Sequence, residues 1–403
     1  MLIRNKVKPN IRGLILLFFI HPFSSFLLAL YNLKSKYSFT VLLLFFVLFG
    51  YTFIAQNETA DSFRYVEDFN YYKEVSANKY QSDIKEYLTF DSTIKDIYTI
   101  STYFLISKIS DSYHLLFALW SLVFSFFFLK SFRFLIYQKE WNKTLIPIII
   151  AFLFLFSNPI TNINGVRFWT AAWIAVYATF EIVINKNLRY VALALITPLI
   201  HISYLIYFAV LLVYLFSIKY DKIWAVIFII SFFAGTITLE FVQTYKNILP
   251  PLLQNMVFSY TESETALQRI DGLTLPLYAR ILTSLPHYFI NLLIFIFIVK
   301  SKVIKQNKEA YSGFLFLLVW MSFVNFTMPI PSLGGRYLAL GIPFIMYLCL
   351  ILYKKIPQIK RLILFAPLIY SYVIFQWLRF INSIIDYDLL YSFFPHLLIK
   401  NLL

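Results

Sequence analysis

The chain has 403 residues, of which 60% are apolar and only 14% are charged, and its formal net charge is +15. A water-soluble domain of this length needs more polar surface, so the composition excludes one and predicts a polytopic membrane protein. The basic residues fall in short clusters between apolar runs, which is typical of membrane-topology signals and not of a nucleic-acid interface.

The apolar runs predict an all-α fold with about ten to thirteen transmembrane helices in a single domain, residues 1–403. The first run, Gly13 to Leu30, is interrupted at His21-Pro22, and the second extends from Ser38 to Ala55. A less apolar, acidic stretch from about 56 to 110 predicts a large outer loop with amphipathic helices at the interface. Further spans are expected at Tyr113–Leu129, Leu145–Ser157, Val166–Ile184, Leu188–Phe216, Ile223–Thr244, Ile281–Val299, Tyr311–Met328, Tyr337–Leu352 and Leu362–Trp377. A second outer loop is expected at about 245–279 and an outer C-terminal tail at about 379–403.

Five clusters rich in lysine should face the cytoplasm together. They lie at 130–143, 186–189, 219–222, 300–308 and 354–361. This arrangement requires the 29-residue run Leu188–Phe216 to enter and return on one side, because about 20 residues already cross the hydrocarbon. His201 would then lie near the outer turn, with Pro198 beside it. The basic N-terminus fits only if the first run is a hairpin bent at His21-Pro22.

The same charge argument places a further set of ionisable residues at or near the outer leaflet, and most of them are arginines. They are Asp61, Arg64, Arg167, His201, Arg269, Arg280, Arg336 and Arg379. Ionisable groups are costly in hydrocarbon, so each is a candidate for function. Arginine donates two parallel hydrogen bonds to phosphate and stays charged when partly desolvated. The pattern therefore favours an anionic, lipid-linked ligand in the outer leaflet.

Arg167 stands in a local sequence that suits an anion site. It follows Asn164 and Gly165 at the start of an apolar helix, whose N-terminal dipole favours a nearby anion. The alternative is an arginine that snorkels from the helix start to the interface.

Arg336 repeats this pattern after Gly334 and Gly335, because glycine lets the backbone approach a ligand closely. The alternative is a plain turn between two spans. His201 is a candidate substrate contact or a hydrogen-bonded interhelical histidine, and Asp61 is a candidate base or a solvated loop carboxylate.

No motif supports a metal or another cofactor. The histidines are dispersed, and the single cysteine lies in an apolar run, so we expect a metal-independent protein. A coupled transporter favours paired discontinuous spans in two related halves, whereas this chain shows one folded-back block without a matching partner.

Four short motifs resemble the EpsG-like branch of the Wzy-type polysaccharide polymerases. The first two are N-G-V-R-F-W-T-A-A-W-I-A at 164–175 and I-T-P-L-I-H-I-S-Y-L-I at 196–206. The branch's D-x-x-x-Y-x-x-x-F element matches Asp61, Tyr65 and Phe69, and G-G-R-Y-L contains Arg336. Phe168 departs from the pattern, because the branch commonly has glutamine after the first arginine.

The resemblance implies a glycosyltransferase that polymerises undecaprenyl-pyrophosphate-linked oligosaccharide repeat units for O antigen, capsule or exopolysaccharide. It implies a multi-pass protein of the bacterial inner membrane with its active site facing the periplasm or outside. The bilayer and the lipid-linked oligosaccharides would be its partners, with the pathway's chain-length regulator and flippase as further candidates.

On this scheme Arg167 and Arg336 contact the pyrophosphate, with Arg280 as a third contact, and stabilise the leaving group without a metal. Asp61 is the candidate base for the acceptor hydroxyl, and His201 is the alternative. Tyr65, with Asn164 and Gly165, completes the expected substrate site.

Three other functions stay open at this point. They are a flippase or transporter of lipid-linked oligosaccharides, a membrane glycosyltransferase or acyltransferase that modifies the polymer, and a noncatalytic scaffold of an envelope-assembly complex. The flippase also needs basic groups facing an anionic lipid, but it makes no glycosidic bond.

Overall fold

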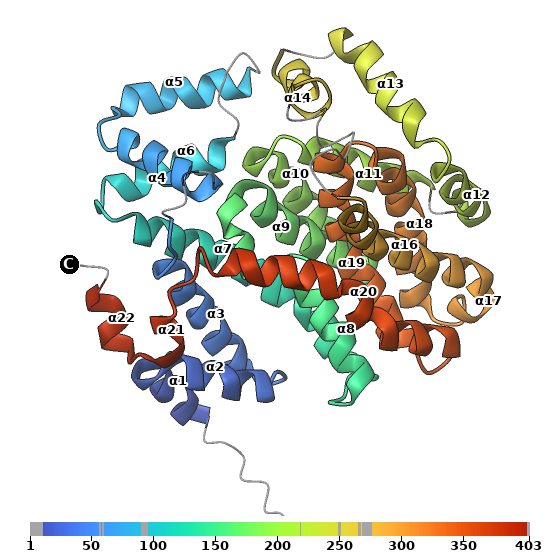
Figure 1. The fold of residues 1–403 in the computed structure, drawn as a ribbon, viewed down its shortest axis with the longest axis horizontal. Helices are drawn as coiled ribbons and strands as arrows, with labels where there is room; N and C mark the ends of the chain where they lie inside the picture. The colour runs from blue at the N-terminus through green and yellow to red at the C-terminus, as the bar shows by residue number, and fades with distance from the viewer. Residues whose placement is uncertain are drawn as a thin grey trace, which may run out of the picture.

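The computed structural model describes residues 11–55, 58, 60–89, 96–217, 219–248, 251–264, 267 and 276–400. Every regular element in this part of the chain is a helix (Figure 1), which confirms the all-α prediction. Among the described residues, six helical runs are long and apolar enough to cross a membrane, and five shorter apolar helices accompany them. The chain is therefore a multi-pass membrane protein.

The helices are named here in the order in which they follow one another along the chain. The N-terminal ones are α1 (Ile11–Ile20), α2 (Pro22–Tyr31), α3 (Lys36–Tyr51), α4 (Asp61–Tyr72), α5 (Ala77–Leu88), α6 (Ile97–Ser107) and α7 (Tyr113–Ile136). The middle ones are α8 (Leu145–Phe156), η1 (Ile160–Gly165), α9 (Val166–Val183), η2 (Leu188–Tyr190), α10 (Val191–Ile200), α11 (Tyr204–Ser217), α12 (Asp221–Ser231), α13 (Gly235–Tyr245), η3 (Lys246–Ile248) and α14 (Pro251–Thr261). The C-terminal ones are α16 (Leu277–Val299), α17 (Ser301–Ile304), α18 (Lys308–Thr327), α19 (Pro331–Leu352), α20 (Pro357–Ile381), α21 (Asp388–Tyr391) and α22 (Phe394–Lys400).

The first apolar run bends where the sequence indicates. His21 caps α2 by accepting a hydrogen bond from the Ser24 amide at 3.2 Å, and Pro22 occupies the first helical position. The Ser25 hydroxyl donates to the Leu14 carbonyl at 2.7 Å, so α2 folds back against α1. This is the predicted hairpin.

The apolar run Leu145–Val183 forms two antiparallel helices, α8 and α9. The Phe154 ring lies 5.9 Å from the Trp173 ring, whereas Asn158, further along the chain, donates to the earlier Trp169 carbonyl at 3.0 Å. Helices form at both predicted spans, within one apolar run of 39 residues, and the short 3-10 helix η1 makes the turn between them.

The block Leu188–Phe216 reverses direction at His201, as predicted. Near its start, the Tyr190 hydroxyl lies 3.4 Å from that of Tyr177, close to the end of α9. At the end of α10, the His201 ring packs 5.4 Å from the ring of Phe168, near the beginning of α9. The helix α10 is thus antiparallel to α9.

The helix α11 then returns beside α9. The Tyr207 hydroxyl donates to the Ala175 carbonyl at 3.0 Å and lies 2.8 Å from the Thr179 hydroxyl, one turn further on. The next expected span, 223–244, is divided instead, since α12 ends at Ser231 and α13 begins at Gly235.

The loops that carry lysine meet at one end of the bundle, which we call the lysine end. Lys143 donates to the Tyr31 carbonyl at 2.7 Å, and Lys186 donates to the Ser312 hydroxyl at 2.7 Å. Lys305 pairs with Asp221 at 2.8 Å. The first contact ties the α7–α8 connection to the end of α2, the second ties the α9–α10 connection to the start of α18, and the third ties the α17–α18 connection to the start of α12. The clusters at 186–189, 219–222 and 300–308 thus lie together, as the charge pattern predicts.

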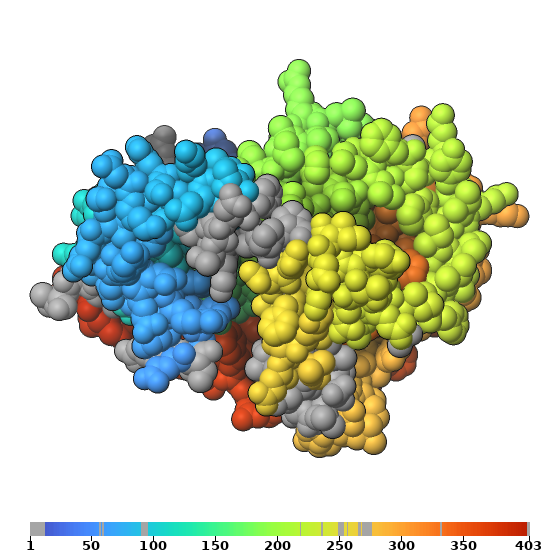
Figure 2. Space-filling view, turned by 90° about the horizontal axis from the view of Figure 1, so that it is seen from above, coloured from blue at the N-terminus to red at the C-terminus, as the bar shows by residue number. Residues whose placement is uncertain are grey.

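The opposite end carries a helical cap made of α4, α5 and α6, with α13 and α14 at the other side of the same face (Figure 1). Figure 2 shows this end from above, with the cap in blue and α13–α14 in yellow. We call it the cap end. The Tyr87 hydroxyl of α5 donates to the Pro198 carbonyl at 2.9 Å, which ties the cap to the last turn of α10.

Candidate functional site

The start of α9 is held by the buried hydrogen bonds of Asn158 at the end of α8, which we call the polar lock. Asn158, only 3% exposed, donates to the Trp169 carbonyl at 3.0 Å and accepts from the Asn162 amide at 2.8 Å. Its backbone carbonyl accepts from the Trp173 indole at 3.0 Å. Buried polar groups that are satisfied in this way fix a unique geometry. The lock therefore orients the turn that precedes Arg167.

That turn joins the bundle to the cap. The Ser62 amide, in the first turn of α4, donates to the Asn164 side-chain oxygen at 3.3 Å. A Cβ added at Gly165 would lie 3.9 Å from an Asp61 carboxylate oxygen, so the glycine backbone lies close to this acid. Asp61 thus meets Asn164 and Gly165, which lie about a hundred positions further along the sequence.

A polar cavity of about 340 Å³ opens between the cap and Arg167. It is lined by Asp61, Arg64, Tyr65, Asp68, Tyr71, Tyr72, Asp96, Thr99, Ile100, Tyr103 and Arg167. Pockets of this volume hold small ligands such as one or two sugar rings. Its aromatic rings offer stacking faces, and its carboxylates accept hydrogen bonds from hydroxyl groups.

Arg167 lies at the edge of this cavity and is held from two sides. Its Nη1 atom donates to Asp96 at 3.4 Å, and its guanidinium carbon lies 5.8 Å from the centre of the Tyr65 ring. Its Nε atom is buried, and no hydrogen-bond partner lies beside it in the described part of the chain. The Arg167 side chain as a whole is 23% exposed, so part of its guanidinium group faces the cavity.

Asp96 is the main member of the site that sequence analysis missed. Its side chain is 1% exposed and caps α6 by accepting from the amide and hydroxyl of Thr99 at 2.6 and 2.8 Å. Burial raises the pKa of this carboxyl, and the charge of Arg167 opposes the shift. The spacing Asp96-x-x-Thr99 is a helix N-cap signal, but it does not indicate that Arg167 lies nearby.

Two other cavity residues differ in protonation and exposure. Burial raises the pKa of Tyr65 to about 12, so its phenol stays neutral at physiological pH. Asp61 forms an ion pair with Arg64 on the next turn, and its side chain is 38% exposed. Asp61 is thus a carboxylate in contact with the open cavity, whereas Asp96 is already occupied by three donors.

Arg336 and His201 form a second group, joined to the first through Phe168. The Arg336 guanidinium carbon lies 5.2 Å from the centre of the Phe168 ring, and the His201 ring lies 5.4 Å from the same ring. His201 is 8% exposed and lies 2.8 Å from the Ser203 hydroxyl through Nδ1. Among the described residues no carboxylate pairs with Arg336, so its charge is available.

The start of α19 differs from the expected turn before Arg336. The helix begins at Pro331 and includes Gly334 and Gly335. A Cβ on Gly334 would lie 2.5 Å from the Met328 Cα atom, so this glycine lets α19 approach the end of α18. Gly335 has no such neighbour within 4 Å. The close approach is thus between two helices, and it places Arg336.

The remaining predicted residues lie apart from the cavity. Arg280 is exposed in the first turn of α16, and it is not among the cavity's lining residues. Arg269 falls outside the described residues. Within the described residues, no three histidine, cysteine or carboxylate side chains gather as metal ligands.

Comparison with known proteins gives one match. The model of the EpsG family, a family of Wzy-like polysaccharide polymerases, matches residues 37–397 and so spans nearly all of the chain, including both groups of site residues. No curated protein and no solved structure matches.

Proposed function

This chain belongs to the EpsG family, and on that premise we propose that it polymerises oligosaccharide repeat units carried on undecaprenyl pyrophosphate. The observation that carries the proposal is the cavity at the cap end, where an oriented arginine, an accessible carboxylate and aromatic rings meet at the edge of a membrane bundle. A lipid-linked sugar needs all three, together with a route from the bilayer.

The cavity's charge suits the acceptor sugar. Its lining contains three carboxylates, from Asp61, Asp68 and Asp96, against the two guanidinium groups of Arg64 and Arg167. An excess of acceptors of this kind favours hydroxyl groups over a pyrophosphate. We place the terminal sugar of the acceptor here, with its reacting hydroxyl toward Asp61.

The pyrophosphate of the donor belongs on the other side of the first turn of α9. Arg336 has no carboxylate partner there among the described residues, and the Arg167 side chain, on the first turn of α9 next to Phe168, is 23% exposed. Two arginines can stabilise the charge that develops on a departing pyrophosphate. His201, packed on Phe168 beside Arg336, acts as a positioning residue, and Arg280 is a candidate for an outer contact with the lipid headgroup.

The reaction then balances without any further reagent. The acceptor hydroxyl oxygen bonds to the anomeric carbon of the donor chain while the bond from that carbon to the pyrophosphate oxygen breaks. The hydroxyl proton goes to Asp61, and the pyrophosphate leaves with the electron pair beside Arg336 and Arg167. The growing chain is transferred to one fresh lipid-linked unit.

The gathering of lysines at the opposite end supports an orientation. Basic loops face the cytoplasm in most membrane proteins, so the lysine end faces the cytoplasm and the cap end faces outward. The protein would then act in the bacterial inner membrane on substrates in its outer leaflet, where the pathway's flippase delivers them and a chain-length regulator is a candidate partner.

The test is the length distribution of surface polysaccharide in a deletion strain restored with wild-type or variant genes. Arg336→Ala should leave single repeat units in place of long chains, because losing one such contact costs about 10²-fold in rate. Asp61→Asn should act similarly, since loss of a general base costs at least about 10²-fold.

The exposed Arg379, at the end of α20, provides the matched control. Arg379→Ala should leave the ladder intact at the same protein level. A strain without the gene that shows no surface units of any length would identify a flippase instead. Long chains at wild-type yield from Arg336→Ala would remove that residue from the site.

A further inference from the structure

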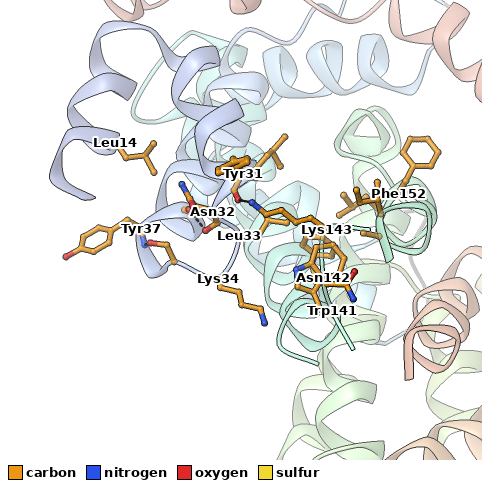
Figure 3. Close-up of a pocket in the computed structure, with 17 residues that line it drawn as sticks. Leu14, Tyr31, Asn32, Leu33, Lys34, Tyr37, Trp141, Asn142, Lys143 and Phe152 are labelled. Atoms are coloured by element: carbon orange, nitrogen blue, oxygen red, sulfur yellow. Dashed lines mark hydrogen bonds between the residues drawn. The ribbon is translucent and has the colours of Figure 1, made fainter. Parts of the chain in front are cut away.

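A second large cavity lies at the lysine end, opposite the candidate site. It is a groove of about 750 Å³ between the α2–α3 connection, the α7–α8 connection and one side of α8 (Figure 3). Its wall is mainly apolar and includes Leu14, Ile148, Phe152 and Leu155. The proposed polymerase chemistry uses none of these residues.

The groove is open to the bilayer along α8. Ile148 is 48% exposed and Phe152 is 44% exposed, on a helix that belongs to a candidate membrane span. An apolar space of this size does not hold water well, and the neighbouring medium beside such a helix is hydrocarbon. We therefore expect a lipid acyl chain to occupy the groove.

The mouth of the groove is basic. Lys34 and Lys143 both line it, and none of its lining residues is acidic. Lys143 donates one hydrogen bond to the Tyr31 carbonyl at 2.7 Å, which leaves two of its three donors for a ligand. Neither lysine forms an ion pair within the described residues, so both positive charges are uncompensated.

Aromatic residues place this mouth at the depth of lipid headgroups. Figure 3 shows Trp141 and Asn142 on the same short loop as Lys143, whose side chain reaches toward Tyr31. The Lys143 nitrogen lies 3.3 Å from the centre of the Tyr31 ring. Tryptophan and tyrosine gather where the headgroups meet the hydrocarbon, and basic pockets between helices at that depth bind anionic headgroups.

We propose that this groove binds an anionic glycerophospholipid of the surrounding leaflet. The phosphate lies against Lys34, Lys143 and the Asn142 amide, and one acyl chain follows α8 past Ile148 and Phe152. The site is separate from the cap cavity, so it does not depend on the reaction proposed there. It fits charge and shape together, because a zwitterionic lipid would fill the groove but its own ammonium group would offset the attraction between its phosphate and the two lysines.

Photo-crosslinking of the full-length protein in nanodiscs tests this. The probe is phosphatidylglycerol with a diazirine in its acyl chain, compared with phosphatidylcholine that carries the same chain. Peptides from α8 and α1 should be labelled several-fold more by the anionic probe. Since each lysine near an anionic headgroup contributes a factor of about five in affinity, K34Q/K143Q should bring its labelling down to the phosphatidylcholine level.

Two further variants complete the design. K354Q/K355Q removes two exposed lysines from the α19–α20 connection at the same end, outside the groove, and should leave the preference unchanged. Ile148→Trp fills the groove and should lower labelling by both lipids. Equal labelling by the two lipids, or a preference that survives K34Q/K143Q, would overturn the proposal. So would stronger labelling by a polyprenyl phosphate probe, which would assign the groove to an isoprenoid.

Discussion

Gly334→Ala tests the close approach of α18 and α19 beneath Arg336. The added Cβ would lie 2.5 Å from the Met328 Cα atom and 2.8 Å from both the Met328 nitrogen and the Thr327 carbonyl oxygen. All three are backbone atoms, which cannot rotate away as a side chain can. The first turn of α19 must therefore move, and overpacking of this kind costs about 1–3 kcal/mol.

Gly335→Ala is the matched control on the next residue. No atom outside the adjacent backbone lies within 4 Å of its added Cβ. Both variants gain about 1 kcal/mol of helix propensity, because alanine is favoured over glycine inside a helix. The difference between them thus isolates the clash.

The assay is thermal unfolding of the two purified variants in the same detergent. We expect the midpoint of Gly334→Ala to lie a few degrees below that of Gly335→Ala, at roughly 2 °C or less per kcal/mol for a chain of this size. Arg336 follows two residues later, so Gly334→Ala should also shorten the polymer more than its control. Equal midpoints, or a more stable Gly334→Ala, would refute the packing argument.

Two further predictions concern the cap. Burial raises the pKa of the Asp96 carboxyl above its ordinary value of 3.8. Protonation of this carboxyl removes its ion pair with Arg167. Polymerisation should therefore fall as the pH decreases through the raised pKa of Asp96. The same titration should stabilise the fold, because the raised pKa makes the ionised form the costly one and its cost disappears at low pH. Asp96→Asn should lower activity and remove that acid limb, and an unchanged pH profile would contradict the assignment. Tyr87→Phe removes the hydrogen bond to the Pro198 carbonyl, worth about 1 kcal/mol, and should speed proteolysis within the cap. Tyr71 is exposed, so Tyr71→Phe is the control and should leave the rate of proteolysis unchanged. Equal cleavage rates of the two variants would show that the hydrogen bond from Tyr87 does not hold the cap.

Sequence alone determined the features that depend on composition and on neighbouring residues. Apolar runs predicted a helical membrane protein, because the backbone must satisfy its own hydrogen bonds in hydrocarbon. The lysine clusters predicted which loops share an end, and the length of Leu188–Phe216 predicted its reversal at His201. Asp61, Arg167 and Arg336 were likewise found as costly charges in short motifs.

The tertiary structure decided which of these charges meet, because that depends on contacts between residues far apart in the chain. Asp96 resembled any other acid of a polar loop until the fold buried it beside Arg167, 71 positions away. The same fold divided the predicted site, with Arg167 facing the cap and Arg336 facing His201 across Phe168. The structure also gives Gly334 a role different from the predicted one. Because it has no side chain, the end of α18 can pack closely against α19, and this contact becomes visible only when the two helices are packed together.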